Sequence, residues 1–580
     1  MAGLDLGIVV GYFVIITVIG VAVSRRASGS IEGYFLGGRN IPWYILGISG
    51  MATFVDISGT AFQVGFFYLL GAKGFWICWQ GAIALGLAFF MIFMGKWLTR
   101  SGAMTNAEWM TIRFGAETQG RLARFLSAFS ILIIVIAFLG YFFVGAAKVL
   151  PMYVPIFENP KHIALLFFVL VGIYTVSSGF HGVVVTDVIQ GVLMFGLIIF
   201  VAVKAMIVGT PEYFAAYAPA GWLDLWPETW TISLPEQYKS MEGLGILLIF
   251  WIIANVLQGF AMPFDAWTSQ RYYAAKDERE SSLIAGQWIS LFSFRFLLMA
   301  GFGVLALSVA DKIADPEMAL AVVIKETIPT GVKGLLLAGL IAAAMSTLDS
   351  FVNSSAAYFV RDIYQEFINP KAEQKRLVKV SYITTAVIMV VGIILGWNLK
   401  SIGSIWGWIV MGLFTGTLPP NIVKWYWWRF NGAGFAGGMI SGMIAAVVTQ
   451  LFFAGEPVYI TFIVVLAISS IGTIVSVFLA KPTEMETLVT FYKKCRPFGF
   501  WSPVRSLCDP ELVRAANVEN RRDLLLLAPT CIWQIMLFWM MTAIVLKKWT
   551  AVGISAAVVV PLSLVLYKFW YKNLKGSKTA

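Results

Sequence analysis

Ser346 and Thr347 place two hydroxyl groups inside a strongly apolar stretch of the chain, 334–360. With Ala343 and Ser350 they are spaced at i, i+3, i+4 and i+7, so on an α-helix they share one face. Small residues let another backbone approach closely, and hydroxyl oxygens suit hard cations such as sodium. The spacing is therefore compatible with a cation site, although simple helix packing also produces such faces.

Five ionisable side chains fall within or beside other apolar stretches. A charge at membrane depth is costly, so such residues indicate either a functional site or an internal ion pair. Some are flanked by apolar sequence on both sides, whereas others lie close to the ends of their stretches, where an interface location is an equal alternative. The five residues are Asp56, Asp187, Asp265, Arg295 and Asp349.

The composition indicates that membrane helices position these residues. Hydrophobic residues make up 59% of the 580 residues and charged residues only 13%, with a mean hydropathy of +0.81. Continuous apolar runs of about 20 residues favour helices over the alternating strands of a membrane β-barrel. We expect an all-α polytopic membrane protein with about 15 transmembrane helices. The runs are 7–24, 42–70, 74–98, 121–148, 162–178, 183–208, 244–265, 282–309, 334–360, 377–397, 403–424, 433–454, 459–480, 525–546 and 550–570.

Basic residues gather after the odd-numbered runs, where Arg271 and Lys424 count as loop charges. The positive-inside rule then predicts the N-terminus outside and the C-terminus inside. The net charge of +11 is accordingly assigned to cytoplasmic loops and not to nucleic-acid binding. The expected location is the bacterial inner (plasma) membrane. The expected organisation is a transmembrane domain over 1–480, a basic cytoplasmic loop over 481–524 and a C-terminal helical pair over 525–580.

Two runs contain polar and helix-breaking residues at matching places. The second run contains FVDISGT at 54–60, and the seventh contains Gln258, Pro263 and Asp265. Each run opens a group of five, and broken helices at corresponding places in two halves indicate the midplane site of a transporter with inverted repeats. Unwound carbonyls that line a cavity can coordinate a cation. The two groups are 42–208 and 244–424.

Five stretches together resemble the sodium:solute symporter family, in the order and spacing of that family. The resemblance covers roughly 5–480, and the last stretch is the most specific. It implies a LeuT-type fold of five-plus-five inverted repeats and sodium-driven uptake of a small organic solute. The stretches are GYFLGGRNIPW (33–43), TNAEWMTIRFG (105–115), VVVTDVIQ (183–190), TSQRYYAAKD (268–277) and LAGLIAAAMSTLDSFVNSSAAYFVRDIY (337–364).

The resemblance implies a sodium ion between the break in the second run and the hydroxyl face of the ninth. Asp187 matches an aspartate that family members use near a second sodium position or in coupling. Asp56 matches a position that is aspartate in proline-transporter-like members and asparagine in sugar-transporter-like ones. The implied sodium ligands are the carbonyls of Phe54, Ile57 and Ala343 and the hydroxyls of Ser346 and Thr347.

The solute is expected between the two broken runs and the third, eighth and eleventh runs. Arg295 could bind a carboxylate or sugar hydroxyls, or pair internally with Asp56 or Asp187. Trp267 and Trp406 are among the tryptophans that could stack on a sugar ring. A sugar or sugar derivative is the first expectation, and an amino acid or other carboxylate is the second. The candidate solute-binding residues are Thr60, Gln80, Gln258, Asp265 and Arg295.

Three other classes of function are weighed against sodium symport. Proton-coupled symport on the same fold is the nearest alternative, with Asp56 or Asp187 carrying the proton. A channel is disfavoured because no carbonyl-filter motif such as TVGYG is present. An enzyme is not expected, because the two histidines, His162 and His181, belong to no catalytic cluster. The expected partners are the lipid bilayer, sodium and a small organic solute, with no oligomer required.

Overall fold

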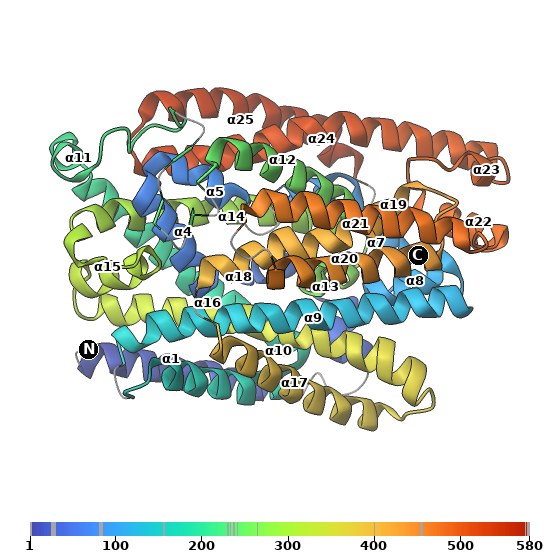
Figure 1. Cartoon of the computed structure of the whole chain (residues 1–580), viewed down its shortest axis with the longest axis horizontal. Helices are drawn as coiled ribbons and strands as arrows, with labels where there is room; N and C mark the ends of the chain where they lie inside the picture. Colours follow the sequence, from blue (N-terminus) through green and yellow to red (C-terminus); the bar gives the residue numbers. More distant parts are fainter. Residues whose placement is uncertain are drawn as a thin grey trace.

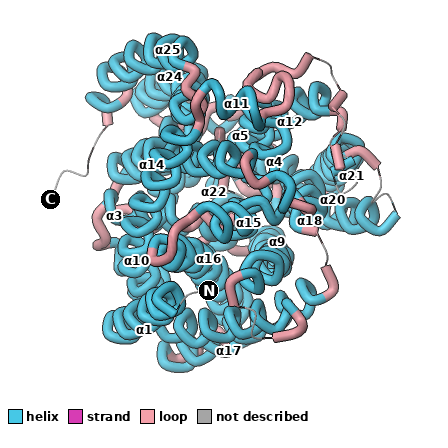
Figure 2. Tube along the Cα trace, turned by 90° about the vertical axis from the view of Figure 1, so that its left-hand side faces the viewer, coloured by secondary structure: helices cyan, strands magenta, loops and turns pink. Residues whose placement is uncertain are grey.

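The structure is a computed structural model that describes residues 3–24, 31–80, 85–154, 157–228, 231–232, 234–235, 238–239, 242–263, 265–399, 401–452, 456–574 and 576. Apart from an isolated bridge between Trp427 and Phe500, the regular elements of these residues are helices. They run mainly along the long axis of the molecule (Figure 1). Figure 2, viewed along the bundle, shows α1 and α17 at one edge and α24 and α25 at the opposite edge.

Within the described residues, twelve helices are long and apolar enough to cross a membrane. The other three predicted runs are present in different forms. The third run is helical at 74–80 and 86–101, and 81–84 lie outside the described residues. The eleventh is helical over 402–426 with a π-helical turn at 409–414, and the fifth forms the first part of α10. The total of fifteen crossings therefore stays a prediction. The long uninterrupted helices are α1 (Gly3–Ser24), α9 (Thr118–Val149), α10 (Pro160–Val208), α12 (Leu244–Ala261), α14 (Glu278–Leu307), α16 (Val332–Ala357), α17 (Gln374–Trp397), α20 (Gly432–Phe452), α21 (Val458–Leu479), α24 (Pro510–Val545) and α25 (Trp549–Phe569).

Shorter helices complete or connect these elements. Three of them, η3, η8 and η9, are wider π-helical turns, which often occur at functional sites. The short helices are α2 (Ile31–Leu36), η1 (Gly37–Arg39), α3 (Trp43–Ala52), α4 (Ile57–Leu70), η2 (Gly71–Lys73), α5 (Gly74–Gln80), α6 (Gly86–Phe89), η3 (Phe90–Met94), α7 (Gly95–Ser101), α8 (Asn106–Phe114), η4 (Leu150–Met152), α11 (Pro211–Tyr217), α13 (Ala266–Tyr273), η6 (Ala310–Lys312), η7 (Pro316–Met318), α15 (Ala319–Thr327), η8 (Tyr358–Ile368), α18 (Ile402–Trp408), η9 (Ile409–Phe414), α19 (Thr415–Tyr426), α22 (Met485–Cys495), α23 (Ser502–Arg505) and η10 (Tyr571–Asn573).

The second and seventh predicted runs are both broken, and both breaks end in the same way. Asp56 and Asp265 have extended backbones, and each carboxylate caps the helix that follows. Asp56 accepts a hydrogen bond of 2.6 Å from the Gly59 amide, and Asp265 accepts one of 2.7 Å from the Thr268 amide. Such a cap satisfies an amide that the first turn leaves free. Matching half-helix starts are what an inverted repeat requires.

The first break lies slightly earlier than the sequence suggests. The residues outside regular helix are Thr53 to Asp56, so Ser58 and Gly59 belong to α4. The Asp56 cap explains the difference, because it allows helical structure to begin at Ile57. The second break lies between the end of α12 at Ala261 and the start of α13 at Ala266, and its described residues are Met262, Pro263 and Asp265.

Several cations that the sequence assigns to loops are buried instead, and Arg271 and Lys424 are two of them. Arg271 belongs to α13 and Lys424 to α19, and their exposed fractions are 0% and 1%. Buried charges require polar partners. Arg271 forms an ion pair of 3.2 Å with Asp187, and the Lys424 ammonium donates to the Asn421 side chain at 2.6 Å. The loop assignment of these two residues was wrong because a charge at the end of an apolar run resembles a loop charge.

Helix α25 runs back toward the end of the bundle that lies opposite the start of α1 (Figure 1). Asp5 near the start accepts hydrogen bonds from the Gly331 and Gly334 amides at 2.7 and 2.9 Å. Trp570 near the other end donates to the Met91 carbonyl at 3.0 Å. Opposite ends are what an odd number of crossings requires. The assignment of either end to the cytoplasm stays a prediction.

The predicted basic loop 481–524 forms α22, α23 and the first part of α24. Buried and half-buried ion pairs join α24 to the transmembrane bundle. Lys96 on α7 pairs with Asp523 and, at 3.1 Å, with Glu519. Arg100 pairs with Glu519 and with Glu278 of α14, each at 2.7 Å. These ion pairs thus attach α24 to α7, and the Arg100–Glu278 pair joins α7 to α14; the pair α24–α25 lies along one edge of the molecule (Figure 1).

Candidate functional site

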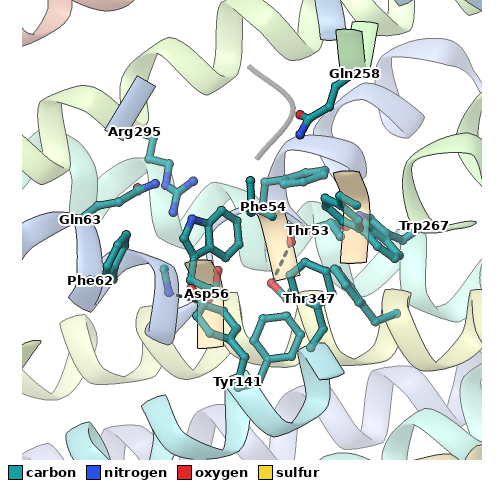
Figure 3. A pocket seen from close by; sticks show the side chains of 17 residues that line it. Thr53, Phe54, Asp56, Phe62, Gln63, Tyr141, Gln258, Trp267, Arg295 and Thr347 are labelled. Atoms are coloured by element: carbon teal, nitrogen blue, oxygen red, sulfur yellow. Dashed lines mark hydrogen bonds between the residues drawn. The ribbon is translucent and has the colours of Figure 1, made fainter. Parts of the chain in front are cut away.

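The hydroxyl face of α16 lies directly against the first helix break. Thr347 Oγ1 is 2.8 Å from the Thr53 carbonyl oxygen and 2.9 Å from the Ala343 carbonyl oxygen (Figure 3). Its single proton can be donated to only one of these two carbonyl oxygens at a time. The other carbonyl oxygen is then available to a cation. Phe54 lies in the break and Ile57 begins α4. The structure thus brings together the two segments that carry the predicted sodium ligands.

Ser346 connects this face to a buried charge network. Its hydroxyl donates to Asp187 Oδ1 at 2.5 Å, and the Ser49 hydroxyl donates to Asp187 Oδ2 at 2.5 Å. The Arg271 guanidinium donates to Asp187 Oδ2 at 3.2 Å and to the Thr53 hydroxyl at 2.6 Å. Because Ser346 donates its proton to a carboxylate, the lone pairs of its oxygen stay free to bind a cation.

A cavity with about 640 Å³ of empty volume, part of it open to solvent, adjoins this face. Phe54 and Thr347, two of the predicted sodium ligands, line it. The cavity is built from both broken helices together with α9, α14, α16 and the α18–η9 segment. Its lining residues are Thr53, Phe54, Asp56, Gly59, Phe62, Gln63, Phe138, Tyr141, Phe142, Gln258, Trp267, Arg295, Thr347, Phe351, Trp406, Val410 and Phe414.

The polar side of the cavity contains charges of both signs around Gly59. A Cβ built on Gly59 would lie 2.7 Å from Asp56 Oδ2, 3.1 Å from the Tyr141 hydroxyl and 3.2 Å from Arg295 Nη2. These three polar groups therefore surround one small space (Figure 3). No ion pair within 4.0 Å joins Asp56 to Arg295 in the described part of the chain. Asp187, the other expected partner of Arg295, pairs with Arg271.

Five buried polar atoms of the cavity wall have no hydrogen-bond partner among the described residues. Buried polar atoms in native proteins are almost always satisfied, so these atoms require a solute or water. Four of them belong to groups that can donate a hydrogen bond, and the glutamine oxygen only accepts. The atoms are Gln63 Oε1, Tyr141 Oη, Trp267 Nε1, Arg295 Nε and Trp406 Nε1.

Aromatic rings form the opposite side of the cavity. Trp267 stacks on Phe351 with ring centroids 3.9 Å apart and an interplanar angle of 15°. Phe138 contacts both rings, and Trp406 lies 5.6 Å from the Tyr141 ring. A wall of this kind covers the apolar face of a small ring, while the polar side fixes its orientation.

Only some of the predicted solute-binding residues line the cavity. Gln258 and Arg295 line the cavity, whereas Thr60 and Asp265 are fully buried and do not. Asp265 caps α13 through one oxygen, and its other oxygen has no partner within the described chain. Gln80 ends α5, but its side chain lies outside the described part of the structure.

Sequence reasoning missed two residues that are prominent in the cavity. Gln63 follows Gly59 by four residues on α4, so helical spacing from the break would have indicated it. Tyr141 lies in the long apolar helix α9, where nothing in the sequence distinguishes it.

Comparison with known proteins identifies the family. A model of the sodium:solute symporter family matches residues 34–442. The chain belongs to this family. A sodium/glucose cotransporter from Vibrio parahaemolyticus is 27% identical over 497 residues, covering 79% of this chain and 86% of that protein. A sodium/pantothenate symporter from Haemophilus influenzae is 26% identical over 480 residues, covering 77% and 91%.

The fold also matches that of a solved sodium-coupled symporter. The chain resembles a sodium-coupled sialic acid symporter, in a substrate-bound outward-open state, with a TM-score of 0.66 and 21% identity. The match covers 83% of this chain and 99% of that one. It confirms the LeuT-type fold expected from the sequence. Family membership makes sodium the coupling ion and a small organic solute the cargo, and the relatives are transporters and not enzymes.

Proposed function

We propose that this protein imports a small organic solute together with sodium by alternating access. Sodium binds between the first helix break and α16, through the carbonyls of Phe54, Ile57 and Ala343 and the hydroxyls of Ser346 and Thr347. The observation that carries the proposal is that Phe54 and Thr347 also line the cavity. Because the ion site and the solute cavity share one wall, binding at either site changes the affinity of the other.

The transport cycle follows from this shared wall. Sodium entering from outside gains about 2.3 kcal/mol per 100 mV if it moves fully across an inside-negative membrane. Its binding holds the first break against α16 and favours the state that accepts solute. Solute then completes the polar and aromatic walls of the cavity, and the two repeats rock around the site to open inward. Asp187 and Arg271 support the ion site, because Asp187 orients the Ser346 hydroxyl.

A sugar or sugar derivative is the first candidate solute. The aromatic wall with Trp267 and Trp406 suits the apolar face of a sugar ring, and the unpartnered donors suit its oxygens. The named substrates of the relatives, which include glucose and sialic acid, are compatible with this choice but belong to those proteins.

A solute with a carboxylate, such as an amino acid, is the second candidate, and Arg295 favours it. Arg295 lines the cavity, its Nε has no partner within the described chain, and no acidic residue of that chain pairs with it. A guanidinium in this state is suited to a carboxylate, which it binds with two parallel hydrogen bonds.

A thermal-shift screen of the purified protein against sugars, sugar acids and amino acids, each with and without sodium, tests both candidates. The true solute stabilises the protein more strongly when sodium is present, because binding is reciprocal. The Arg295→Met variant separates the candidates. It loses at least about 10-fold in affinity for a carboxylate solute, and less for a neutral sugar. Solute binding that does not depend on sodium at any pH would contradict sodium coupling. Uptake driven by a pH gradient in sodium-free buffer would favour proton symport.

A further inference from the structure

Three consecutive residues at the end of α19 each donate a hydrogen bond to a carbonyl at the end of α12. The Lys424 ammonium bonds to the Pro263 carbonyl at 3.3 Å. The Trp425 indole bonds to the Met262 carbonyl at 2.9 Å, and the Tyr426 hydroxyl bonds to the Phe260 carbonyl at 3.2 Å. These carbonyls belong to the last turn of α12 and the second helix break, where the helix supplies no partner. The α19 end therefore replaces the hydrogen bonds that the break leaves unmade.

Lys424 differs from its two neighbours because it brings a charge. It is 1% exposed, and its ammonium also donates to the Asn421 side-chain oxygen at 2.6 Å. The Trp109 ring lies 5.1 Å from the ammonium, in a cation–π arrangement. No acidic side chain of the described chain forms an ion pair with Lys424. Two oxygens, a ring face and the negative end of the α12 dipole thus compensate the charge.

The first break has a different arrangement. There the Thr53 carbonyl accepts a hydrogen bond from the neutral Thr347 hydroxyl of α16. The hydroxyl oxygen keeps lone pairs that a mobile cation can bind. Arg271 also approaches this break, but it is paired with Asp187. In both repeats an aspartate caps the half-helix that follows the break. The carbonyls of the two breaks have different partners, which are hydroxyl groups at the first break and an ammonium at the second.

We propose that the Lys424 ammonium is a resident cation at the second helix break, which holds the end of α12 to α19 as a mobile sodium ion holds the first break to α16. The part of this inference that concerns sodium rests on the proposed function, whereas the role of the ammonium does not. Lys424 is a positioning residue. It fixes the backbone at Pro263, so the second break takes up no mobile cation of its own.

Chemical rescue of the full-length protein tests the proposal without knowledge of the solute. The Lys424→Ala variant removes the ammonium and leaves space for a small cation. Its unfolding midpoint is expected to fall by at least about 3 °C in choline chloride, because the Pro263 carbonyl and the Asn421 side-chain oxygen lose their donor. Ethylammonium chloride at the same concentration should restore more than half of this loss and leave the wild type unchanged.

Two further variants separate charge from packing. Lys424→Met fills the same space without a charge, so ethylammonium should not rescue it. Tyr426→Phe removes a neutral donor from the same carbonyl end and should lose less stability than Lys424→Met, also without rescue. If Lys424→Ala does not fold, the unfolding midpoints of Lys424→Met and Tyr426→Phe still test whether the charge of Lys424 matters.

Equal losses in Lys424→Met and Tyr426→Phe would overturn the proposal. So would a midpoint of Lys424→Ala in ethylammonium chloride no higher than its midpoint in choline chloride, or equal stabilisation of all variants by ethylammonium. A sodium-induced stabilisation of the wild type is measured in parallel, and it should persist in Lys424→Ala because the first break is intact. If sodium did not stabilise the wild type but ethylammonium rescued Lys424→Ala, the proposed sodium site would be contradicted. The proposal of a resident ammonium at the second break would still be supported.

Discussion

At the scale of single residues, Gly59 matters because it lacks a side chain. Asp56, Tyr141 and Arg295 converge on the space that its Cβ would occupy. Gly59 is the third residue of α4, and glycine is less favourable than alanine in helices, by up to about 1 kcal/mol in a helix interior. We propose that access of solute to the three polar groups compensates for this cost.

Gly59→Ala should therefore reduce solute affinity by at least about 10-fold, because the added methyl group would lie 2.7 Å from Asp56 Oδ2 and occupy the polar side of the cavity. Solute-induced thermal shift measures the loss. Gly196→Ala is the matched control, since nothing lies within 4 Å of a Cβ at this exposed position of α10. Equal solute binding by wild type and Gly59→Ala would contradict the assignment of this space to the solute.

At the scale of elements, the two breaks show how far the sequence predicts the site. Ser346 and Thr347 could be found because hydroxyls at helical spacing are conspicuous in an apolar helix. Asp56 and Asp265 could be found for the same reason, and both prove to be helix caps. Arg271 and Lys424 could not, because only the packing of α13 and α19 shows that they are buried.

The cap at the second break predicts a difference between two variants. Asp265→Ala removes the acceptor for the Thr268 amide and should cost about 0.5–2 kcal/mol of stability. Asp265→Asn keeps an acceptor at the same place and should retain most of it. Thermal unfolding of both purified variants measures the difference. Identical midpoints for the alanine and asparagine variants would show that capping is not what Asp265 contributes.

At the scale of the whole molecule, the family match ends at residue 442, before α21 to α25. The C-terminal pair nevertheless joins the bundle through Lys96 and Arg100. Phe538 of α24 also packs against Phe292 and Phe296, which lie on α14 beside the cavity-lining Arg295. Helix α24 therefore contacts an element that lines the cavity.

The predicted topology places the loop between α10 and α12 outside and the start of α24 inside. Single cysteines at two exposed positions, Glu212→Cys and Val518→Cys, test it with a membrane-impermeant maleimide. Glu212→Cys should react in intact cells, and Val518→Cys only after permeabilisation. The native background should be low; burial raises the pKa of the Cys495 thiol to about 12, which keeps it unreactive. The reverse labelling pattern would invert the topology.

The central claim is that the Ser346 and Thr347 hydroxyls bind the ion that drives uptake. The measurement that tests it most directly is sodium-dependent counterflow of the identified solute in proteoliposomes, for the wild type and for the double variant Ser346→Ala with Thr347→Ala. Removal of both hydroxyls takes the two proposed side-chain ligands from the ion site, and Thr347 is the one cavity-lining residue that the double variant changes. We predict that the double variant loses sodium-dependent uptake. Counterflow that stays fully sodium-responsive in this variant would contradict the account.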